Sequence, residues 1–407
     1  MDGDANGRRP RLLVLNQYYW PGVEATANLL TELCEALAED YDVTVVTGGT
    51  RAELPERELR NGVRIVRVHS TAFDRTRLSR RAANYFTYLL GAAREGIGSA
   101  SPDVVVCMTD PPFIGAVAEL IARRFRAPLL VISQDVFPEI AVRLGRLTNP
   151  VVTGVLGMVV SSYLRFADRV VVIGDTMKER IVAKGVDPAR VRVISNWADA
   201  ETVRPQSHDN PWAREHGLVG KFVVMHFGNV GHAQDLDTLV RASTLLRDLD
   251  DLVVAIIGVG ARLQELTTLA EVVEADKVRF LPWQDYELRA EPISAAHVHV
   301  VGLARGLAGY IVPSRLWGVL AAGRPVIAAA EEESETAKVV HETGCGIVVR
   351  PGDPLQLAEA IRACHDGVYD LEEMGRRARA YAESETDRSI AVARYRAVLE
   401  EVQRDRR

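Results

Sequence analysis

Short runs of β-branched and aliphatic residues alternate with helical periodicity along the chain. The apolar runs predict strands at residues 11–16, 43–47, 63–68, 104–108, 128–133, 169–173 and 191–194, and again at 222–226, 252–257, 278–281, 297–301, 326–329 and 346–349. Apolar positions recur at helical spacing at residues 24–38 and 113–125, and a long helical region begins near residue 354. This alternation is typical of parallel sheets covered by helices. We therefore predict an α/β protein with two doubly wound, Rossmann-like domains that face a central cleft and bind ligands at the carboxyl ends of their strands.

Length and composition fit this organisation. The chain has 407 residues, of which 47% are hydrophobic and 26% charged, so two domains of roughly 200 residues each are expected. A polar, proline-containing stretch at residues 196–206 is the predicted linker. The net charge of −6 argues against a nucleic-acid-binding protein, because such proteins rely on a basic face.

The patterns of several other protein classes are missing from the sequence. The four cysteines are far apart and have no histidine at metal-ligand spacing, so we expect buried thiols and no metal. Residues 1–11 are polar, which predicts a protein that is not secreted. Residues 147–164 carry no charge but include proline, glycine and polar residues, so a buried helix is expected rather than a membrane span. No G-x-G-x-x-G motif follows the first strand, which argues against a dinucleotide-binding domain.

Residues 309–327 contain the strongest candidate for an anion site. Pro313 and Ser314 interrupt an apolar strand-like run, and an apolar helix-like segment follows, ending at residues 323–325 before the next strand. Ser314 and Arg315 are thereby predicted to lie at a helix N-terminus, where backbone N–H groups, a hydroxyl and a guanidinium can bind an anion. The alternative is an ordinary capped helix with a solvated arginine.

Glycine-containing turns follow other strands of the second half. Gly228, Asn229 and Gly231 predict a loop whose backbone faces a phosphate, with Asn229 as an amide donor. The turn at residues 258–260 resembles it, although such a turn more often serves packing. Pro282 and Trp283 offer backbone groups and an aromatic face to a nucleobase, with a plain turn as the alternative.

An acidic segment at residues 331–335 is predicted to be a solvated loop. Ser334, near its end, is expected to cap the helix that follows and to face the same site.

In the first half, aromatic residues separate the first strand from the first helix. Tyr18, Tyr19, Trp20 and Gly22 lead into a helix that carries Glu24 and Thr26 near its start. The apolar surface suits a sugar ring or a lipid-like acceptor, and Gly22 permits a close approach of the backbone. The alternative is that these aromatics are packed in the interior.

Two carboxylates follow the strand at residues 128–133. Either Asp135 or Glu139 could accept a proton if burial or a neighbouring charge tuned its pKa. In the alternative interpretation Asp135 caps a helix and Glu139 occupies its first turn.

Together these segments resemble the retaining glycosyltransferases of family 4, which have the GT-B fold. The resemblance covers nearly the whole chain and rests on NQYYWPGVEATANLLTEL, ADRVVVIGDTMKERIVAKGV, GNVGHAQDLDTLV, VPSRLWGVLAAGRPVIA and ETGCGIVVRPGDP. It is similar to the bacterial branch of colanic-acid and O-antigen enzymes, which includes N-acetylfucosamine transferases. The resemblance implies an acceptor-binding domain at residues 1–200, a nucleotide-sugar-binding domain at 201–385, and a final helix at 386–407 that packs on the first domain. It also implies transfer with retention of configuration, without a metal ion.

The sequence departs from the common family pattern at the donor site. Two glutamates that many members carry correspond here to Tyr310 and Gly318, and two cations correspond to Asn229 and Gln234. Arg315, with Arg324 as a second candidate, is therefore expected to neutralise the diphosphate.

These considerations assign a role to each candidate residue. Catalytic roles are expected for Arg315, Asp135 and Asn229. The donor is expected to contact Gly228, Gly231, Gly258, Pro282, Trp283, Gly309, Tyr310, Ile311, Pro313, Ser314, Arg315, Ser334 and Glu335. The acceptor is expected to contact Tyr18, Tyr19, Gly22, Glu24, Thr26, Asp135 and Glu139. Backbone amides of residues 305–310 are expected to surround the sugar.

The predicted activity is transfer of a sugar, from a UDP-sugar such as UDP-GlcNAc or a related amino sugar, to a hydroxyl of a glycan, lipid-linked or small-molecule acceptor. No cofactor is expected besides the nucleotide-sugar. A non-hydrolysing nucleotide-sugar epimerase and a catalytically silent nucleotide-binding scaffold are the alternatives. The expected location is the cytoplasm. Residues 75–94 combine basic and apolar side chains, so contact with the inner face of the membrane is also considered.

Overall fold

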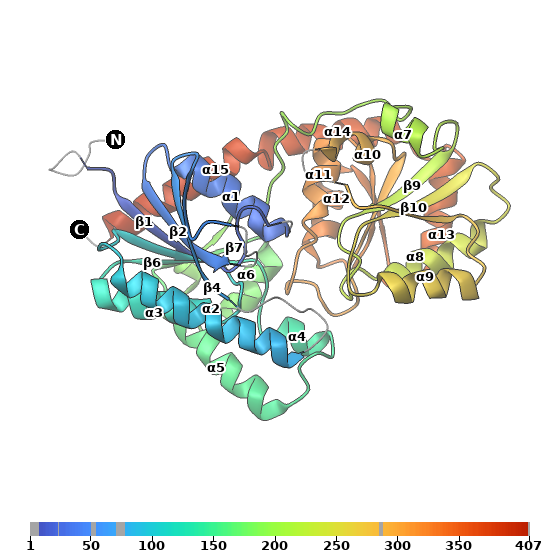
Figure 1. Cartoon of the computed structure of the whole chain (residues 1–407). Coiled ribbons are helices and arrows are strands. Elements are labelled where there is room, and N and C mark those ends of the chain that lie inside the picture. The colour runs from blue at the N-terminus through green and yellow to red at the C-terminus, as the bar shows by residue number, and fades with distance from the viewer. Residues whose placement is uncertain (1–7, 23, 50–53, 71–77, 285–287, 406–407) are drawn as a thin grey trace. The chain divides into compact units, whose positions relative to one another are not determined.

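The computed structural model describes residues 8–22, 24–49, 54–70, 78–284 and 288–405, without the side chains of residues 78–82 (Figure 1). The chain divides into two compact units, Met1–Ser195 with Val392–Arg407, and Asn196–Ala391. Each unit contains one sheet with helices packed on it, as the alternating pattern predicts.

The first unit contains an eight-stranded sheet with the order β3-β4-β2-β1-β5-β6-β7-β8. All neighbouring strands are parallel except β3 and β4. The strands are β1 (Arg11–Leu15), β2 (Asp42–Gly49), β3 (Arg57–Arg60), β4 (Val63–His69), β5 (Val104–Cys107), β6 (Leu129–Ser133), β7 (Arg169–Val172) and β8 (Val191–Val193). The helices are α1 (Ala25–Leu37), α2 (Leu78–Gly98), α3 (Ile114–Phe125), α4 (Glu139–Arg143), α5 (Pro150–Phe166), α6 (Asp175–Val182) and a 3-10 turn, Pro188–Arg190.

The second unit contains a six-stranded parallel sheet with the order β11-β10-β9-β12-β13-β14. The strands are β9 (Phe222–Phe227), β10 (Leu252–Ile257), β11 (Val278–Leu281), β12 (Val298–Gly302), β13 (Val326–Ala329) and β14 (Gly346–Val349). The helices are α7 (Pro211–Glu215), α8 (Leu236–Ser243), α9 (Leu263–Val272), α10 (Ala290–Ser294), α11 (Arg315–Ala321), α12 (Glu335–Thr343), α13 (Pro354–His365) and α14 (Leu371–Glu385), with a 3-10 turn at Thr244–Leu246.

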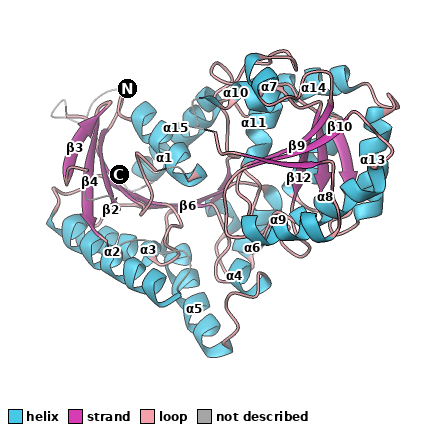
Figure 2. Ribbon diagram, turned by 45° about the vertical axis from the view of Figure 1, so that its right-hand side comes forward, coloured by secondary structure: helices cyan, strands magenta, loops and turns pink. Residues whose placement is uncertain are grey.

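Helices cover both faces of this second sheet (Figure 2). Helices α8, α9 and α13 pack with one another in one layer, and α11, α12 and α14 form contacts in another. The strands between them are almost continuously apolar, and all six residues of β10 are buried. A parallel sheet needs such strands because both of its faces are removed from water.

The last helix, α15 (Arg388–Arg404), begins in the second unit and continues into the first. Within the first unit its later turns form ion pairs, including Glu401 with Arg169 and Arg396 with Glu39. The chain changes unit at residues 195–196 and 391–392, whereas the sequence predicts boundaries at 200–201 and 385–386.

Helix α5 corrects one expectation. Asn149 caps it by accepting hydrogen bonds from the backbone N–H groups of Val151 and Val152, and Pro150 occupies its first turn. Its first half is not buried, because Val151 is 73% exposed and Met158 is 66% exposed. Among the described residues, no helix combines the length and apolarity needed to cross a bilayer.

All four cysteines are buried free thiols, as predicted. They are Cys34, Cys107, Cys345 and Cys364. Within the described part of the chain, no group of three or more histidine, cysteine, aspartate or glutamate side chains is arranged to hold a metal ion.

Candidate functional site

Arg315 lies against a buried histidine at the carboxyl edge of the second sheet. It is the first residue of α11, which follows β12, and its side chain is partly buried. Its Nη1 lies 2.7 Å from Nδ1 and 3.0 Å from Nε2 of His226, near the end of the neighbouring strand β9. Burial lowers the pKa of the Arg315 guanidinium to about 9, which leaves it charged at neutral pH.

His226 is fully buried and is held in its neutral form. Burial and the Arg315 charge lower its pKa well below the usual value. A neutral imidazole has one donor and one acceptor nitrogen. Its Nε2 lies 3.3 Å from the carbonyl oxygen of Asn229, so Nε2–H donates to that carbonyl and Nδ1 accepts from Arg315. Sequence reasoning missed His226, although a histidine inside an apolar strand just before a glycine loop is an available signal.

The loop at residues 228–231 packs beside the same guanidinium. Gly228 has φ = 139°, and a Cβ atom placed there would lie 3.6 Å from the Arg315 Nε. Its N–H donates to the carbonyl of Ile257 (2.9 Å), and the Val230 N–H donates to Val259 (2.9 Å). The Gly231 N–H donates to the side-chain oxygen of Gln234 (3.0 Å).

The prediction that the backbone N–H groups of residues 228–231 face a phosphate is therefore corrected. Three of its N–H groups, those of Gly228, Val230 and Gly231, are used within the protein. Asn229 is the exposed residue of the loop. Gln234, which occupies the position of a family cation, instead satisfies a backbone amide.

The turn at residues 258–260 supports this loop by close packing. A Cβ atom at Gly258 would lie 1.8 Å from the carbonyl oxygen of Gly228, and one at Gly260 would lie 2.1 Å from that of Val230. Only glycine fits at these positions without displacing the loop. Gly258, expected at the donor, thus holds Gly228 in place.

An aromatic pair lies next to the loop. The rings of Phe227, the last residue of β9, and Trp283 are roughly parallel, with centroids 6.1 Å apart and an interplanar angle of 28°. Trp283 is partly exposed and Pro282 is exposed. The pair offers a flat apolar surface of the kind on which a nucleobase stacks.

The loop expected to surround the sugar is bound by a carboxylate of the protein itself. Glu331 accepts hydrogen bonds from the N–H groups of Gly306 (2.9 Å) and Ala308 (3.4 Å). These amides are therefore occupied, and Glu331 does not belong to a freely solvated acidic loop. Tyr310 is buried, and Gly309 has φ = 77°, a conformation that favours glycine.

The two serines differ in their roles. Ser334 caps α12 as predicted, because its hydroxyl accepts from the Ala337 N–H at 3.2 Å; Glu335 follows in the first turn. Ser314 precedes α11 without a side-chain capping hydrogen bond. Ile311 and Ser314 are partly buried, while Pro313 is buried.

Arg324 lies at the opposite edge of the sheet from Arg315. It comes two residues before β13 begins, whereas His226 lies near the end of β9. Because the strands are parallel, the amino end of one strand and the carboxyl end of another lie at opposite edges. The fold therefore removes Arg324 as a second cation for the same anion, and no carboxylate of a described residue forms an ion pair with Arg315.

In the first unit, two carboxyl groups gather at the carboxyl edge of adjacent strands. Asp135 follows β6, and burial, together with the nearby charge of Asp110, raises its pKa to about 7. Asp110 follows β5 and accepts a hydrogen bond from the Thr26 hydroxyl at 3.1 Å. Sequence reasoning missed Asp110, although it follows its strand much as Asp135 does.

Other expected acceptor contacts are placed differently. Tyr19 is 4% exposed, and burial raises the pKa of its hydroxyl, so its ring belongs to the core. The Gly22 N–H donates to the Tyr19 carbonyl at 2.7 Å, and a Cβ atom at Gly22 would lie 2.8 Å from that oxygen. Tyr18 and Glu24 are partly buried. Glu139, the first residue of α4, forms an ion pair with Lys184.

Two family models match the chain, one in each half. The Glycosyl transferase 4-like domain matches residues 24–197. The Glycosyl transferases group 1 domain matches residues 221–366. Both matches agree with the two α/β units.

Individual proteins give the same result. The chain is 28% identical over 324 residues to a Pseudomonas aeruginosa protein named "Probable glycosyltransferase WbjE", covering 79% of this chain and 80% of that one. It is 26% identical over 238 residues to an Escherichia coli (strain K12) protein named "Putative colanic acid biosynthesis glycosyl transferase WcaI", covering 58% of this chain and 57% of that one. The crystal structure of HepE from Anabaena in complex with UDP has a TM-score of 0.75 at 14% identity, covering 96% of this chain and 100% of HepE.

Proposed function

The chain is a glycosyltransferase of the GT-B fold, and from this premise we propose that it transfers a sugar from a UDP-sugar to an acceptor hydroxyl with retention of configuration and without a metal ion. The proposed donor is UDP-GlcNAc or a related amino sugar, and the proposed acceptor is a glycan, a lipid-linked saccharide or a small molecule. The observation that carries the proposal is the Arg315–His226 pair, which presents a charged guanidinium without a carboxylate partner among the described residues. A partly buried cation of this kind is stabilised by an anion.

The diphosphate is proposed to bind at Arg315. Breaking the bond between the anomeric carbon and the diphosphate leaves negative charge on the departing UDP. A guanidinium already held in place stabilises that charge without reorganising during the reaction. Asn229 supplies an amide donor, and the Phe227–Trp283 surface stacks against the uracil ring. The UDP bound in the HepE structure supports the choice of base.

The acceptor hydroxyl is proposed to bind in the first unit, near Thr26, Asp110 and Asp135. A carboxyl group with a pKa of about 7 is well matched to accept a proton at neutral pH. The acceptor oxygen forms a bond to the anomeric carbon on the face from which UDP leaves. UDP departs with the bonding electrons, and the hydroxyl proton passes to Asp135. No covalent intermediate with the protein is proposed.

The family matches favour transfer over the alternatives. Both models describe glycosyl transferase domains, and neither describes an epimerase. Incubation with labelled UDP-sugars separates the three possibilities. A transferase releases UDP in the presence of acceptor, an epimerase inverts C2, and a silent scaffold binds donor without turnover.

The decisive variant is Arg315→Ala. A thermal-shift screen of UDP-, GDP- and dTDP-sugars first identifies the donor, because a ligand that binds the native state raises its melting temperature. With that donor at saturation, we expect Arg315→Ala to lower turnover by about a hundredfold or more, a loss typical of one such donor group. Arg241→Ala, at an exposed position of α8, is the matched control and is expected to keep full activity. Unchanged turnover in Arg315→Ala refutes the assignment.

We further propose that the protein is cytoplasmic and contacts a membrane surface through its first unit. Part of the basic segment 75–94 lies outside the described residues, but α2 exposes Phe86 (62%) and Leu90 (56%). The first turns of α5 add exposed Val151, Val155 and Met158. Exposed apolar side chains near basic residues suit partial insertion into an anionic bilayer.

A further inference from the structure

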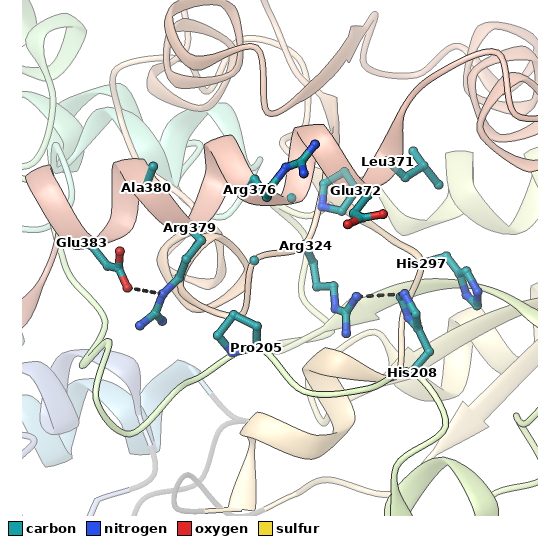
Figure 3. Close-up of a pocket in the computed structure, with 13 residues that line it drawn as sticks. Pro205, His208, His297, Arg324, Leu371, Glu372, Arg376, Arg379, Ala380 and Glu383 are labelled. Carbon is teal, nitrogen blue, oxygen red and sulfur yellow. Dashed lines mark hydrogen bonds and ion pairs between the residues drawn. The ribbon is translucent and has the colours of Figure 1, made fainter.

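The second unit contains a cavity of about 690 Å³ that is separate from the proposed donor site (Figure 3). The linker, the segments that precede β12 and β13, and helix α14 line it. His297 immediately precedes β12, and Arg324 comes just before β13, so the cavity lies at the amino edge of the sheet. Arg315 and His226 lie at the carboxyl edge. The volume is within the range of small-molecule sites.

Arg324 is the cation at the centre of this cavity. Its Nη1 lies 2.9 Å from Nε2 of His208, and its Nη2 donates to the carbonyl of Gln206. Both partners are neutral acceptors, and its Nε is buried without a hydrogen-bond partner. No carboxylate of a described residue forms an ion pair with this guanidinium. A largely buried cation with only neutral partners carries an uncompensated charge, which an anion would offset.

The two neighbouring histidine side chains add no charge to the cavity. The rings of His208 and His297 stack with centroids 4.1 Å apart and an interplanar angle of 6°. Burial, followed by the charge of Arg324, lowers the pKa of both histidines, to about 3 for His208. Both rings are therefore neutral and present a flat wall beside the guanidinium.

The three arginines of the cavity are not equivalent. Arg379 is fully used in holding the fold, because it donates to the carbonyls of Ala200, Val203 and Ala321 and pairs with Glu383. Arg376 pairs with Glu373 through Nε and Nη2, but its side chain is 63% exposed at the rim of the cavity, and a solvent-exposed ion pair of this kind contributes little to stability. Arg324 and Arg376 are therefore available to an anion, whereas Arg379 is structural.

The remaining polar group of the wall is a carboxylate. Glu372 stands beside Arg376 on α14 in Figure 3. A carboxylate repels a second anion but accepts hydrogen bonds from hydroxyl groups. The wall therefore suits a molecule with an anionic end and a hydroxylated body.

We propose that this cavity is a second ligand site, which binds the phosphate monoester of a small polyol or sugar. Arg324 and Arg376 hold the phosphate, and Glu372 accepts hydrogen bonds from the hydroxyl groups. Close backbone packing shapes the site, because a Cβ atom at Gly375 would lie 2.4 Å from the carbonyl oxygen of Gly323. The proposal does not depend on which sugar the enzyme transfers.

The test is a ³¹P NMR titration with glucose 6-phosphate and, separately, inorganic phosphate, at constant ionic strength. Saturable broadening is expected with the wild-type protein. Arg324→Gln is expected to raise the Kd for both probes at least tenfold, while Arg315→Ala changes it less than twofold. Loss of binding in Arg315→Ala but not in Arg324→Gln would place the phosphate at the donor site and overturn the proposal. Absence of saturable broadening with the wild-type protein would also overturn it.

Two further variants complete the test. Arg376 lies at the exposed rim, so Arg376→Gln is expected to fold even if Arg324→Gln does not. It is expected to weaken binding of both probes at least threefold. Unchanged affinity in this variant contradicts the proposal. Glu372→Gln is expected to weaken binding of glucose 6-phosphate but not of inorganic phosphate. Equal affinity of the wild-type protein for the two probes overturns the assignment of a polyol. Melting curves establish that each variant is folded.

Discussion

His226 offers a sharp test of how the proposed donor site is held together. We consider His226→Leu, which removes both ring nitrogens, beside His226→Asn and His226→Gln. Asparagine places a polar atom near the position of Nδ1, which accepts from Arg315 at 2.7 Å. Glutamine places its amide near Nε2, which donates to the Asn229 carbonyl at 3.3 Å. The pair therefore separates the two hydrogen bonds.

The expected magnitudes follow from these contacts. A hydrogen bond from a charged donor contributes about 1.5–3 kcal/mol, and a neutral one about 0.5–1.5 kcal/mol. His226→Leu, which removes both hydrogen bonds, should therefore lower the free energy of unfolding by roughly 2–4.5 kcal/mol. It should also lower kcat by about tenfold or more, because a misplaced guanidinium stabilises the leaving group less well. His226→Asn should keep most of the activity, and His226→Gln should resemble His226→Leu in kcat.

The assay is donor turnover at saturating UDP-sugar, with unfolding followed in parallel. The same histidine substitution is then made in the Arg315→Ala background. If His226 acts by positioning Arg315, His226→Leu has little further effect on kcat in the Arg315→Ala background, because the effects of substituting two residues that act as a unit are not additive. The same loss of kcat in both backgrounds would refute the reasoning and leave His226 with a purely structural role.

Three further predictions concern other parts of the molecule. Asp135→Asn should abolish the rise of kcat with pH through about 7. Because folding raises the pKa of Asp135 above its unfolded value, the wild-type protein loses stability as the pH rises toward 7. Asp135→Asn should therefore have a higher melting temperature than wild type at pH 8 and a similar one at pH 4. Equal melting temperatures at pH 8 would contradict the burial argument. Gly258→Ala should destabilise the second unit by about 1–3 kcal/mol or more, since overpacking against the Gly228 carbonyl has no room to relax. Gly367→Ala is the control for backbone strain alone, because its Cβ position is surrounded by open space while φ is 73°. Equal losses of stability in the two variants would contradict the overpacking argument. Wild-type protein should co-sediment with anionic liposomes at low salt, and Met158→Glu should weaken that binding several-fold; failure of the wild-type protein to bind removes the membrane proposal.

Sequence periodicity was sufficient for the architecture. Apolar runs such as those of β9, β10 and β12 are local patterns, and a parallel sheet requires them because both of its faces are buried. Local chemistry also identified Ser334 as a cap, because a capping hydroxyl bonds to the N–H three residues later. Arg315 was singled out in the same way, from its place at the start of a predicted helix.

The interior of the site depended on contacts between distant segments. His226 and Arg315 are 89 residues apart, and they meet because β9 and β12 are neighbours in the sheet. The N–H groups expected to face a phosphate or a sugar are used by Ile257, Val259, Gln234 and Glu331. A local pattern shows that a loop has N–H groups, but only the folded chain determines which acceptor reaches them first.

Strand direction decided the roles of the two arginines. Arg315 and Arg324 are nine residues apart in sequence, and both are cations near turns of the same segment. The helix between them carries the chain from the carboxyl edge of the sheet to its amino edge, so the two guanidinium groups lie at opposite edges. The sequence by itself therefore determined the fold and one cation of the proposed donor site, whereas the tertiary structure determined the partner of that cation, His226, and placed the second arginine in the wall of a different cavity.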